Sequence, residues 1–201
     1  KNGDKTVFLT GLNFVVVKTP NLRFLNVLII NSSADITGVD LTSVVVTGTG
    51  DFDLNSNTIT GSNSTRVALN ASNLSGSATL NLDGTTNGVA NIQTGSAADT
   101  IKIDGVTADS SGFVIASNGS NDKIRITKNG DGSSAKINID AGGGGSDELS
   151  LAAGVDLSVS NLTLTSVESI MLTGGGATQK IAASDVSGVS LKLKEDGTGT
   201  A

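Results

Sequence analysis

Short runs of aliphatic residues recur along the chain, and each run is bounded by clusters of Gly, Asn, Ser and Asp. In most of them a small or polar residue stands between two aliphatic ones, as in Ile101-Lys102-Ile103 and Ile124-Arg125-Ile126. This alternation is typical of a strand with one buried face. No window keeps the i, i+3, i+4, i+7 spacing of an amphipathic helix over three turns, and frequent Gly and Asn disfavour helix throughout. We therefore expect an all-β chain of many short strands.

From Leu80 onward the aliphatic runs form two interleaved series, and the step within each series is roughly 21 to 25 residues. One series lies at 101–103, 124–126, 149–151 and 170–172, and the other at 89–92, 113–115, 137–139 and 162–164. A steady period indicates a repeat in which each coil contributes one strand to each of two faces. We predict a right-handed parallel β-roll or β-solenoid of about 22 to 25 residues per coil. An antiparallel β-sandwich needs no steady period and is the alternative.

The pattern divides the chain into three segments. Residues 1–34 are the most hydrophobic, and we expect them to form strands or a cap of the solenoid, with strands at 7–9, 14–17 and 27–30. Residues 35–193 are expected to form the solenoid itself, and residues 194–201 a polar tail or linker. Because the sequence starts at Lys1 without a signal peptide, we expect a fragment or a processed product of a longer chain.

A glycine-rich stretch stands before one of these strands. The residues from Gly142 to Ser150, GGGGSDELS, match the nonapeptide G-G-x-G-x-D-x-U-x at every fixed position. Weaker copies stand about one coil apart upstream, around Asp122 and Asp99, and they retain fewer glycines. In all three copies the Asp precedes the first apolar residue of its strand by two positions. Parallel stacking should therefore place Asp99, Asp122 and Asp147 in one column.

A column of carboxylates at strand spacing repels itself, whereas Ca²⁺ between the coils would make the column attractive. Calcium takes six to eight oxygen ligands, including backbone carbonyls, and glycine allows a turn to point its carbonyls inward. We therefore predict calcium as the bound cofactor. The candidate ligands are Asp147 with Gly143 and Gly145, Asp122 with Gly119, and Asp99 with Gly95. The alternative is that each Asp only accepts hydrogen bonds from turn amides. Asp51 and Asp53, after Gly48-Thr49-Gly50, are weaker candidates.

Composition narrows the function. The 201 residues contain 13 Lys and Arg against 19 Asp and Glu, a formal net charge of -6, with no Cys and no His. The acidity argues against a nucleic-acid partner and suits cation binding, although solubility alone would also explain it.

Without His or Cys there is no ordinary nucleophile–base pair, so we expect no enzyme. No apolar run is long enough to span a membrane, so we expect no membrane insertion. A binding module should carry an exposed aromatic or basic patch, and no such patch is evident.

The nonapeptide from Gly142 to Ser150 resembles the RTX repeat. The composition of the chain is acidic, free of Cys and rich in Thr, Ser, Asn, Gly and Asp, and with its short aliphatic strands it resembles that of Gram-negative surface-layer proteins exported by type I secretion. The segment from Leu164 to Leu172, followed by a Gly run, is also similar to segments of those proteins. The resemblance in composition covers nearly the whole chain, whereas the specific nonapeptide motif covers about one coil.

The resemblance implies a calcium-dependent β-solenoid portion of an extracellular, lattice-forming protein of the bacterial cell surface. It implies that the chain stays open at low calcium inside the cell and closes in millimolar calcium outside. It also implies self-association, with anchoring to a cell-surface polysaccharide through a region outside this chain. The alternatives are the stalk of an adhesin or other RTX-type secreted protein, and an accessory module beside a catalytic domain.

Overall fold

The computed structural model describes most of the chain. It leaves out residues 1–4, 11–14, 20–23, 31, 39–41, 55–58, 61–66, 84–88, 106–111, 129–135, 159–160, 175–177, 188–191 and 196–201. Side chains are described from residue 42 onward, except in those gaps and at 60, 83 and 192–195. No helix among the described residues is long and apolar enough to cross a membrane.

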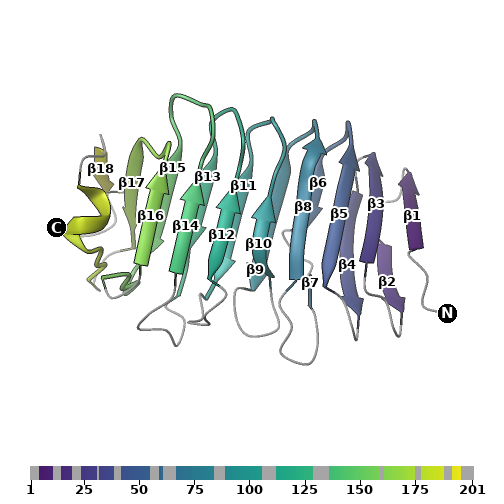
Figure 1. Cartoon of the computed structure of the whole chain (residues 1–201), viewed down its shortest axis with the longest axis horizontal. Helices are drawn as coiled ribbons and strands as arrows, with labels where there is room; N and C mark the ends of the chain where they lie inside the picture. The colour runs from purple at the N-terminus through teal and green to yellow at the C-terminus, as the bar shows by residue number, and fades with distance from the viewer. Residues whose placement is uncertain are drawn as a thin grey trace.

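Two parallel sheets face each other along the whole length of the molecule (Figure 1). The eight-stranded sheet runs in the order β1 (Lys5–Thr10), β3 (Phe24–Ile30), β5 (Ser43–Gly48), β8 (Val67–Leu74), β10 (Val89–Gln93), β12 (Phe113–Ala116), β14 (Lys136–Asp140) and β16 (Asn161–Thr165). The ten-stranded sheet runs in the order β18 (Lys192–Glu195), β17 (Ser169–Thr173), β15 (Glu148–Ala152), β13 (Lys123–Ile126), β11 (Thr100–Asp104), β9 (Ala78–Asp83), β6 (Phe52–Leu54), β4 (Ser32–Gly38) and β2 (Val15–Thr19), with β7 (Ile59–Thr60) also paired to β4.

Each strand pairs in parallel with a strand about one coil away. The predicted β-solenoid is therefore confirmed, and the antiparallel sandwich is excluded. The register of the ten-stranded sheet joins Ile101 to Ile124, Ile124 to Leu149 and Leu149 to Ile170. These steps of 23, 25 and 21 residues follow the period that the sequence predicts.

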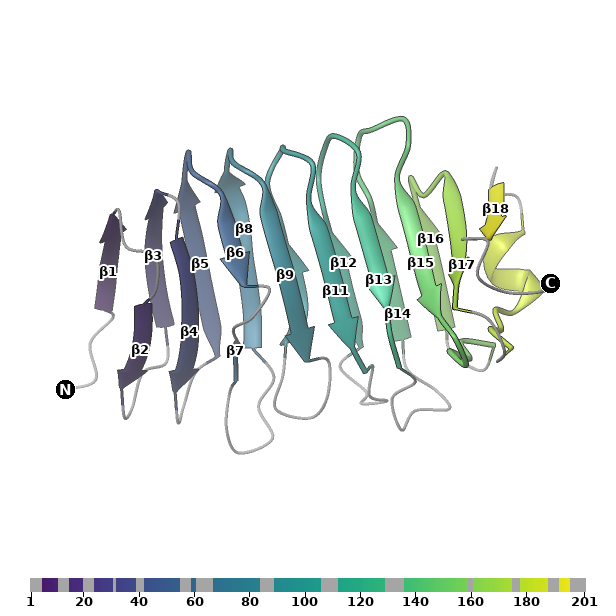
Figure 2. The ribbon, with the colours of Figure 1, turned by 180° about the vertical axis from the view of Figure 1, so that it is seen from behind.

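The N-terminal coils are shorter than those that follow. Val7 pairs with Val27 and Val27 pairs with Val46, so these steps are 20 and 19 residues. The three strands predicted within residues 1–34 correspond to β1, β2 and β3, which pair in the same two sheets as the later strands. At the opposite end of the molecule, β18 extends the ten-stranded sheet as far as Glu195 (Figure 2).

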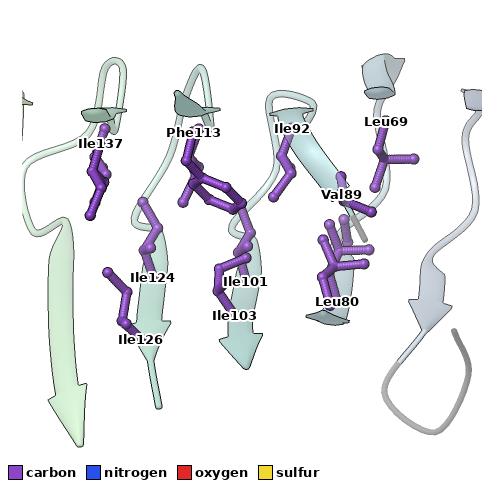
Figure 3. Close-up of a cluster of buried hydrophobic side chains, with 14 of the residues drawn as sticks. Leu69, Leu80, Val89, Ile92, Ile101, Ile103, Phe113, Ile124, Ile126 and Ile137 are labelled. Atoms are coloured by element: carbon purple, nitrogen blue, oxygen red, sulfur yellow. The ribbon is translucent and has the colours of Figure 1, made fainter. Parts of the chain in front are cut away.

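Aliphatic ladders fill the space between the sheets. In β13 the side chains of Ile124 and Ile126 are buried, while Lys123 and Arg125, which alternate with them, are exposed. Figure 3 shows Phe113 reaching from one sheet toward Ile101 on the other. Burying an aliphatic side chain of this size stabilises the fold by about 1.5–3 kcal/mol, so the stacked ladders are the main favourable term.

The C-terminal end changes character. A 3-10 helix, η1 (Ala183–Val186), packs beside β16, the last strand of the eight-stranded sheet. Lys180 pairs with Asp156 through a single parallel bridge and through an ion pair of 2.8 Å between Lys180 Nζ and Asp156 Oδ2. Ile181 and Val186 pack against the core. This segment covers the end of the apolar layer where another strand would otherwise be needed.

Replacing a ladder residue should be costly, whereas replacing its outward neighbour should not. Ile137→Ala should lower the free energy of unfolding by about 2–4 kcal/mol, because it leaves a cavity between the sheets. Asn138→Ala changes an exposed side chain of the same strand and should stay within about 0.5 kcal/mol. Urea denaturation followed by circular dichroism measures both. Equal losses in the two variants would contradict the assigned faces of β14.

Candidate functional site

Three turns carry the chain from the eight-stranded to the ten-stranded sheet at one edge of the solenoid (Figure 2). They comprise residues 94–99, 117–122 and 141–147, and each ends in an aspartate. Thr100 pairs with Lys123 and Lys123 with Glu148, so the preceding residues Asp99, Asp122 and Asp147 are in register. All three side chains are at most 1 % exposed. The predicted column therefore exists, and it lies inside the turns instead of on the surface.

One oxygen of each carboxylate binds the backbone of the coil before it. The Asp99 amide donates to Asp122 Oδ1 at 2.8 Å, and the Asp122 amide donates to Asp147 Oδ1 at 2.7 Å. The ladder begins at the Ala78 amide, which donates to Asp99 Oδ1 at 2.6 Å. It ends where the Asp147 amide donates to Glu168 Oε2 at 2.8 Å. The turn-amide hydrogen bonds that the sequence left as an alternative are therefore present, and they run between coils.

The second oxygen of each carboxylate has no partner in the described part of the chain. Oδ2 of Asp99, Asp122 and Asp147 is buried and accepts no hydrogen bond there. The hydroxyls of Thr94 and Ser117 lie in the same turns as Asp99 and Asp122, and they partly offset the rise that burial causes in the pKa of these two carboxyls. A buried polar group without a partner typically costs about 1–3 kcal/mol. Each turn thus holds an oxygen that can still accept a proton or a cation.

Burial changes the acidity of the whole column. It raises the pKa of Asp122 to about 6, against the hydrogen bond from the Asp99 amide, and the neighbouring carboxylates of Asp99 and Asp147 add to the rise. Burial also raises the pKa of Asp99 and of Asp147. At Asp147 the charge of Glu168 acts in the same direction. The column therefore resists ionisation unless a positive charge accompanies it.

Glycine is required where two successive turns approach each other. A Cβ atom on Gly144 would lie 1.8 Å from the Ser120 carbonyl oxygen of the preceding turn and 3.0 Å from Asp147 Oδ2. The two oxygens therefore face the same small space, which only glycine leaves open. Gly142 has a φ of 76° and would place a Cβ 2.3 Å from the Asn118 carbonyl carbon, so it is constrained in both conformation and space.

The predicted glycine ligands have different surroundings. Gly119 and Gly143 face each other in an isolated parallel bridge, and the Ser120 amide donates to the Gly143 carbonyl at 3.0 Å. Gly95 is buried, and a Cβ on it would lie 1.8 Å from the Leu74 carbonyl oxygen of the preceding coil. Gly145 is exposed, with open space where its Cβ would be. Gly95, Gly119 and Gly143 therefore lie at contacts between coils, whereas Gly145 lies on the outer side of its turn.

Two groups that join the site have weak signals in the sequence. Glu168 stands 21 residues after Asp147 and directly before a strand, so extending the column by one coil would have identified it. Ser117 carries no signal of its own among the many serines of the chain. The weaker candidates lie outside the column: Asp51 and Asp53 are exposed, and Asp51 Oδ1 accepts the Ser77 amide of the following coil at 2.9 Å.

The donor set consists of oxygen alone. Among the described residues no three His, Cys, Asp or Glu side chains gather closely enough to form a metal cluster. A cation at this edge would therefore need turn carbonyls in addition to one or two carboxylates. That combination is characteristic of calcium, which accepts many oxygens in flexible geometry.

Two adjacent glycines allow a matched test of the turn. Gly144→Ala should lower the free energy of unfolding by about 2–3 kcal/mol, because the Ser120 backbone must move to admit the methyl group. Gly145→Ala should stay within about 0.5 kcal/mol. Thermal and urea unfolding of both variants measure the difference. If Gly144→Ala were as stable as Gly145→Ala, the assigned contact between the two turns would be wrong.

The raised pKa of Asp122 makes stability depend on pH in calcium-free buffer. A carboxyl whose folded pKa of about 6 exceeds the ordinary value of 3.8 stabilises the fold fully below pH 3.8, and this contribution is lost as the pH rises through 6. We expect the free energy of unfolding to fall by about 1–3 kcal/mol between pH 4 and pH 7 on account of this group. Asp104 and Asp156 have lowered pKa values, so their titration falls below that window.

The variant Asp122→Asn should reduce this dependence, because the amide does not titrate, while Asp99 and Asp147, whose pKa values are also raised, keep their contributions. Asp104→Asn removes a carboxylate from the opposite end of strand β11 and should leave the dependence unchanged, because the pKa of Asp104 is lowered. Urea unfolding at a series of pH values provides the measurement. A dependence as steep in Asp122→Asn as in the wild type would remove this carboxyl as a source.

Comparisons with family models, with curated proteins and with solved structures find no match for this chain. The features of the chain that bear on its function are the solenoid, the column of buried carboxylates and the resemblance of residues 142–150 to a calcium-binding repeat.

Proposed function

We propose that this chain is a structural segment of a secreted bacterial surface-layer protein, which self-assembles into a lattice on the cell surface and folds on binding calcium. The observation that carries the proposal is the column of Asp99, Asp122 and Asp147, whose second carboxylate oxygens are buried inside glycine-bearing turns with no hydrogen-bond partner among the described residues. The chain is not an enzyme in this proposal, since it contains neither His nor Cys.

Electrostatics favours a divalent cation at this edge. Adjacent strands are about 4.8 Å apart, so two ionised carboxylates in successive coils repel by on the order of 3 kcal/mol at an effective dielectric constant of 20. Burial adds a desolvation cost to each charge. A Ca²⁺ ion between coils offsets both costs at neutral pH, where a proton would be held only weakly by a group with a pKa of about 6.

The residues present fit calcium better than other common metals. Asp147 Oδ2 and the Ser120 carbonyl face one space, and Glu168 brings a second carboxylate to the end of the column. These are hard oxygen donors on turns, which suit calcium, whereas zinc prefers nitrogen and sulfur ligands. Magnesium requires near-ideal octahedral geometry and keeps several waters. The turns at Asp122 and Asp99 would hold further ions in the same column.

The extracellular and lattice-forming parts of the proposal rest on the resemblance to RTX and surface-layer proteins. A solenoid free of Cys needs another source of cross-coil stability outside the cell, and calcium ions between coils supply one. The partners proposed are further copies of the chain, and a cell-surface polysaccharide bound through a region outside it. The elongated stack of coils is consistent with a spacer or lattice element.

Calcium should therefore stabilise the chain through these carboxylates. Adding 1 mM Ca²⁺ to chelator-treated protein should raise the unfolding temperature by roughly 5–10 °C, because an ion present at 100 times its Kd contributes about 2.7 kcal/mol. Asp147→Asn should remove at least about half of this shift. Asp104→Asn, which removes a carboxylate at the other end of strand β11 from Asp99, should retain all of it. Differential scanning calorimetry gives the measurement.

The same samples test assembly. Electron microscopy should show two-dimensional arrays of the wild-type chain after calcium is added, and fewer arrays of Asp147→Asn. If chelation changes neither the far-ultraviolet circular dichroism nor the unfolding temperature, the calcium mechanism is wrong. If calcium stabilises the chain but no arrays form at high protein concentration, the lattice function is wrong while the calcium site stands.

A further inference from the structure

The outer face of the eight-stranded sheet is almost free of charge. A row of residues runs along its middle, one from each of β8, β10, β12, β14 and β16, and the parallel register joins them in the order Ala68, Asn91, Val114, Asn138 and Thr163. All but Ala68 are exposed. Figure 1 shows these strands side by side along the molecule. We call the outward side chains of these five strands the neutral face, and this row its central row.

The charges of the neutral face are one lysine and one aspartate on a single strand. Among all residues of the five strands, only Lys136 and Asp140 are charged, and both belong to β14. They flank Asn138 of the central row, two residues to each side, and all three are exposed. The face therefore has no net charge, although the whole chain has a formal net charge of -6.

Neither charge is compensated by another described residue. Asp140 Oδ1 accepts the Gly142 amide at 3.0 Å, which orients the carboxylate and leaves it negative. Lys136 makes no hydrogen bond and no ion pair within the described part of the chain. The two side chains do not meet each other, because four residues of extended strand separate them by roughly 13 Å. Both charges are therefore available to a partner.

A second copy of the same face can satisfy both charges at once. Two such faces can stack about 10 Å apart around a two-fold axis that lies between them, parallel to the central row. This rotation reverses the strand direction, so Lys136 of each copy lies opposite Asp140 of the other, while Val114 lies opposite Val114. A two-fold axis along β14 would instead place Lys136 against Lys136, and facing like charges are unfavourable.

The apolar centre of the neutral face also fits this arrangement. Val114 is the one large hydrophobic side chain that is exposed in the described part of the chain, with 36 % of its surface accessible. It is the third of the five residues in the central row, so the two-fold axis buries it against its own copy. Exposed apolar surface at the centre of a patch with a polar rim is typical of a protein interface.

The size of the face predicts a weak contact. Five strands about 4.8 Å apart, each with about five residues at about 3.3 Å, cover roughly 400 Å² per copy. The pair would bury roughly 800 Å², which is less than the about 1,200 Å² of a stable complex. A contact of this size is weak in a single pair and becomes strong when it is repeated in an array.

The outer face of the ten-stranded sheet does not offer the same contact. Lys102 and Arg125 are partners in the register of β11 and β13, so their row carries two adjacent positive charges. A two-fold axis along that row would place Lys102 against Lys102 and Arg125 against Arg125. Because two chains of net charge -6 already repel each other, the favoured contact is the one whose facing charges compensate.

We infer that the neutral face is a contact between two copies of this chain, related by a two-fold axis along the central row. Two ion pairs between Lys136 and Asp140 and the pair of Val114 side chains hold it. The inference rests on the proposed self-assembly and deepens it, because it names one surface through which the copies meet.

Sedimentation equilibrium of the full chain in 1 mM Ca²⁺ tests the inference. The wild type should form dimers whose fraction rises with protein concentration. Val114→Asp sets two carboxylates against each other, and Lys136→Glu sets two acids at each former ion pair, so each should raise the dimer Kd at least tenfold. Lys136→Glu/Asp140→Lys restores opposite charges and should return the Kd to within about threefold of the wild type. Circular dichroism checks that each variant is folded.

Arg125→Glu is the matched control, because it makes the same change of charge at an exposed position of the other sheet. It should raise the Kd less than about threefold, through added net repulsion alone. Equal losses in Arg125→Glu and Lys136→Glu would overturn the inference, as would a wild type that stays monomeric up to about 1 mM. Binding of neutral dextran by such a monomer, lost in Val114→Asp, would assign the face to a glycan instead.

Electron microscopy of the same variants separates this inference from the proposed function. If the wild type and both Val114→Asp and Lys136→Glu form equal arrays after calcium is added, the copies meet through another surface, and the inference fails while the proposed assembly stands. If the wild type dimerises through the neutral face but no arrays form, the inference stands while the lattice function fails.

Discussion

Parallel pairing between equivalent strands of successive coils is the constraint on which this structure depends. It places the same position of each coil directly above the last, so whatever one coil carries is repeated at strand spacing. Where the repeated residue is aliphatic, the result is a continuous ladder such as the one through Ile101, Ile124 and Leu149. Where it is charged, the same geometry produces a column of like charges. Such a column requires something more to be stable.

Hydrogen bonds from the backbone stabilise the column of buried carboxylates in part. The Oδ1 atom of each Asp replaces a missing backbone partner, because the amide one coil earlier points into the turn and needs an acceptor. This bond locks the register of successive turns, and it explains why an acid is tolerated where almost everything else is apolar. The Oδ2 atom remains unsatisfied. The backbone hydrogen bond therefore accounts for the Oδ1 atom of each carboxylate. A ligand or a proton is needed to account for the buried Oδ2 atom.

Much of this arrangement could be predicted from the sequence. The period of the aliphatic runs was enough to predict the parallel coils and the alignment of Asp99, Asp122 and Asp147, because a strand has a fixed rise and a fixed alternation of faces. The cross-coil bonds could not be predicted, since they depend on the length of each turn and on where it points an amide. The role of Gly144 was also missed. In the motif its position is unconstrained, yet here it is the glycine closest to Asp147 Oδ2 and the Ser120 carbonyl.

The adjacency of Lys102 and Arg125 in the ten-stranded sheet was missed for a related reason. Local reading places Lys102 and Arg125 in separate strands, each with the ordinary pattern of one polar residue between two isoleucines. Only the register shows that they are adjacent, while the neighbouring Ser150 leaves the row uncharged one coil later. A solenoid thus places the side chains of successive coils side by side, so the length of a charged surface depends on how many successive coils carry a charge at that position. The column of buried carboxylates follows from this one property, and the residues of the turns can vary without disturbing the apolar ladders between the sheets.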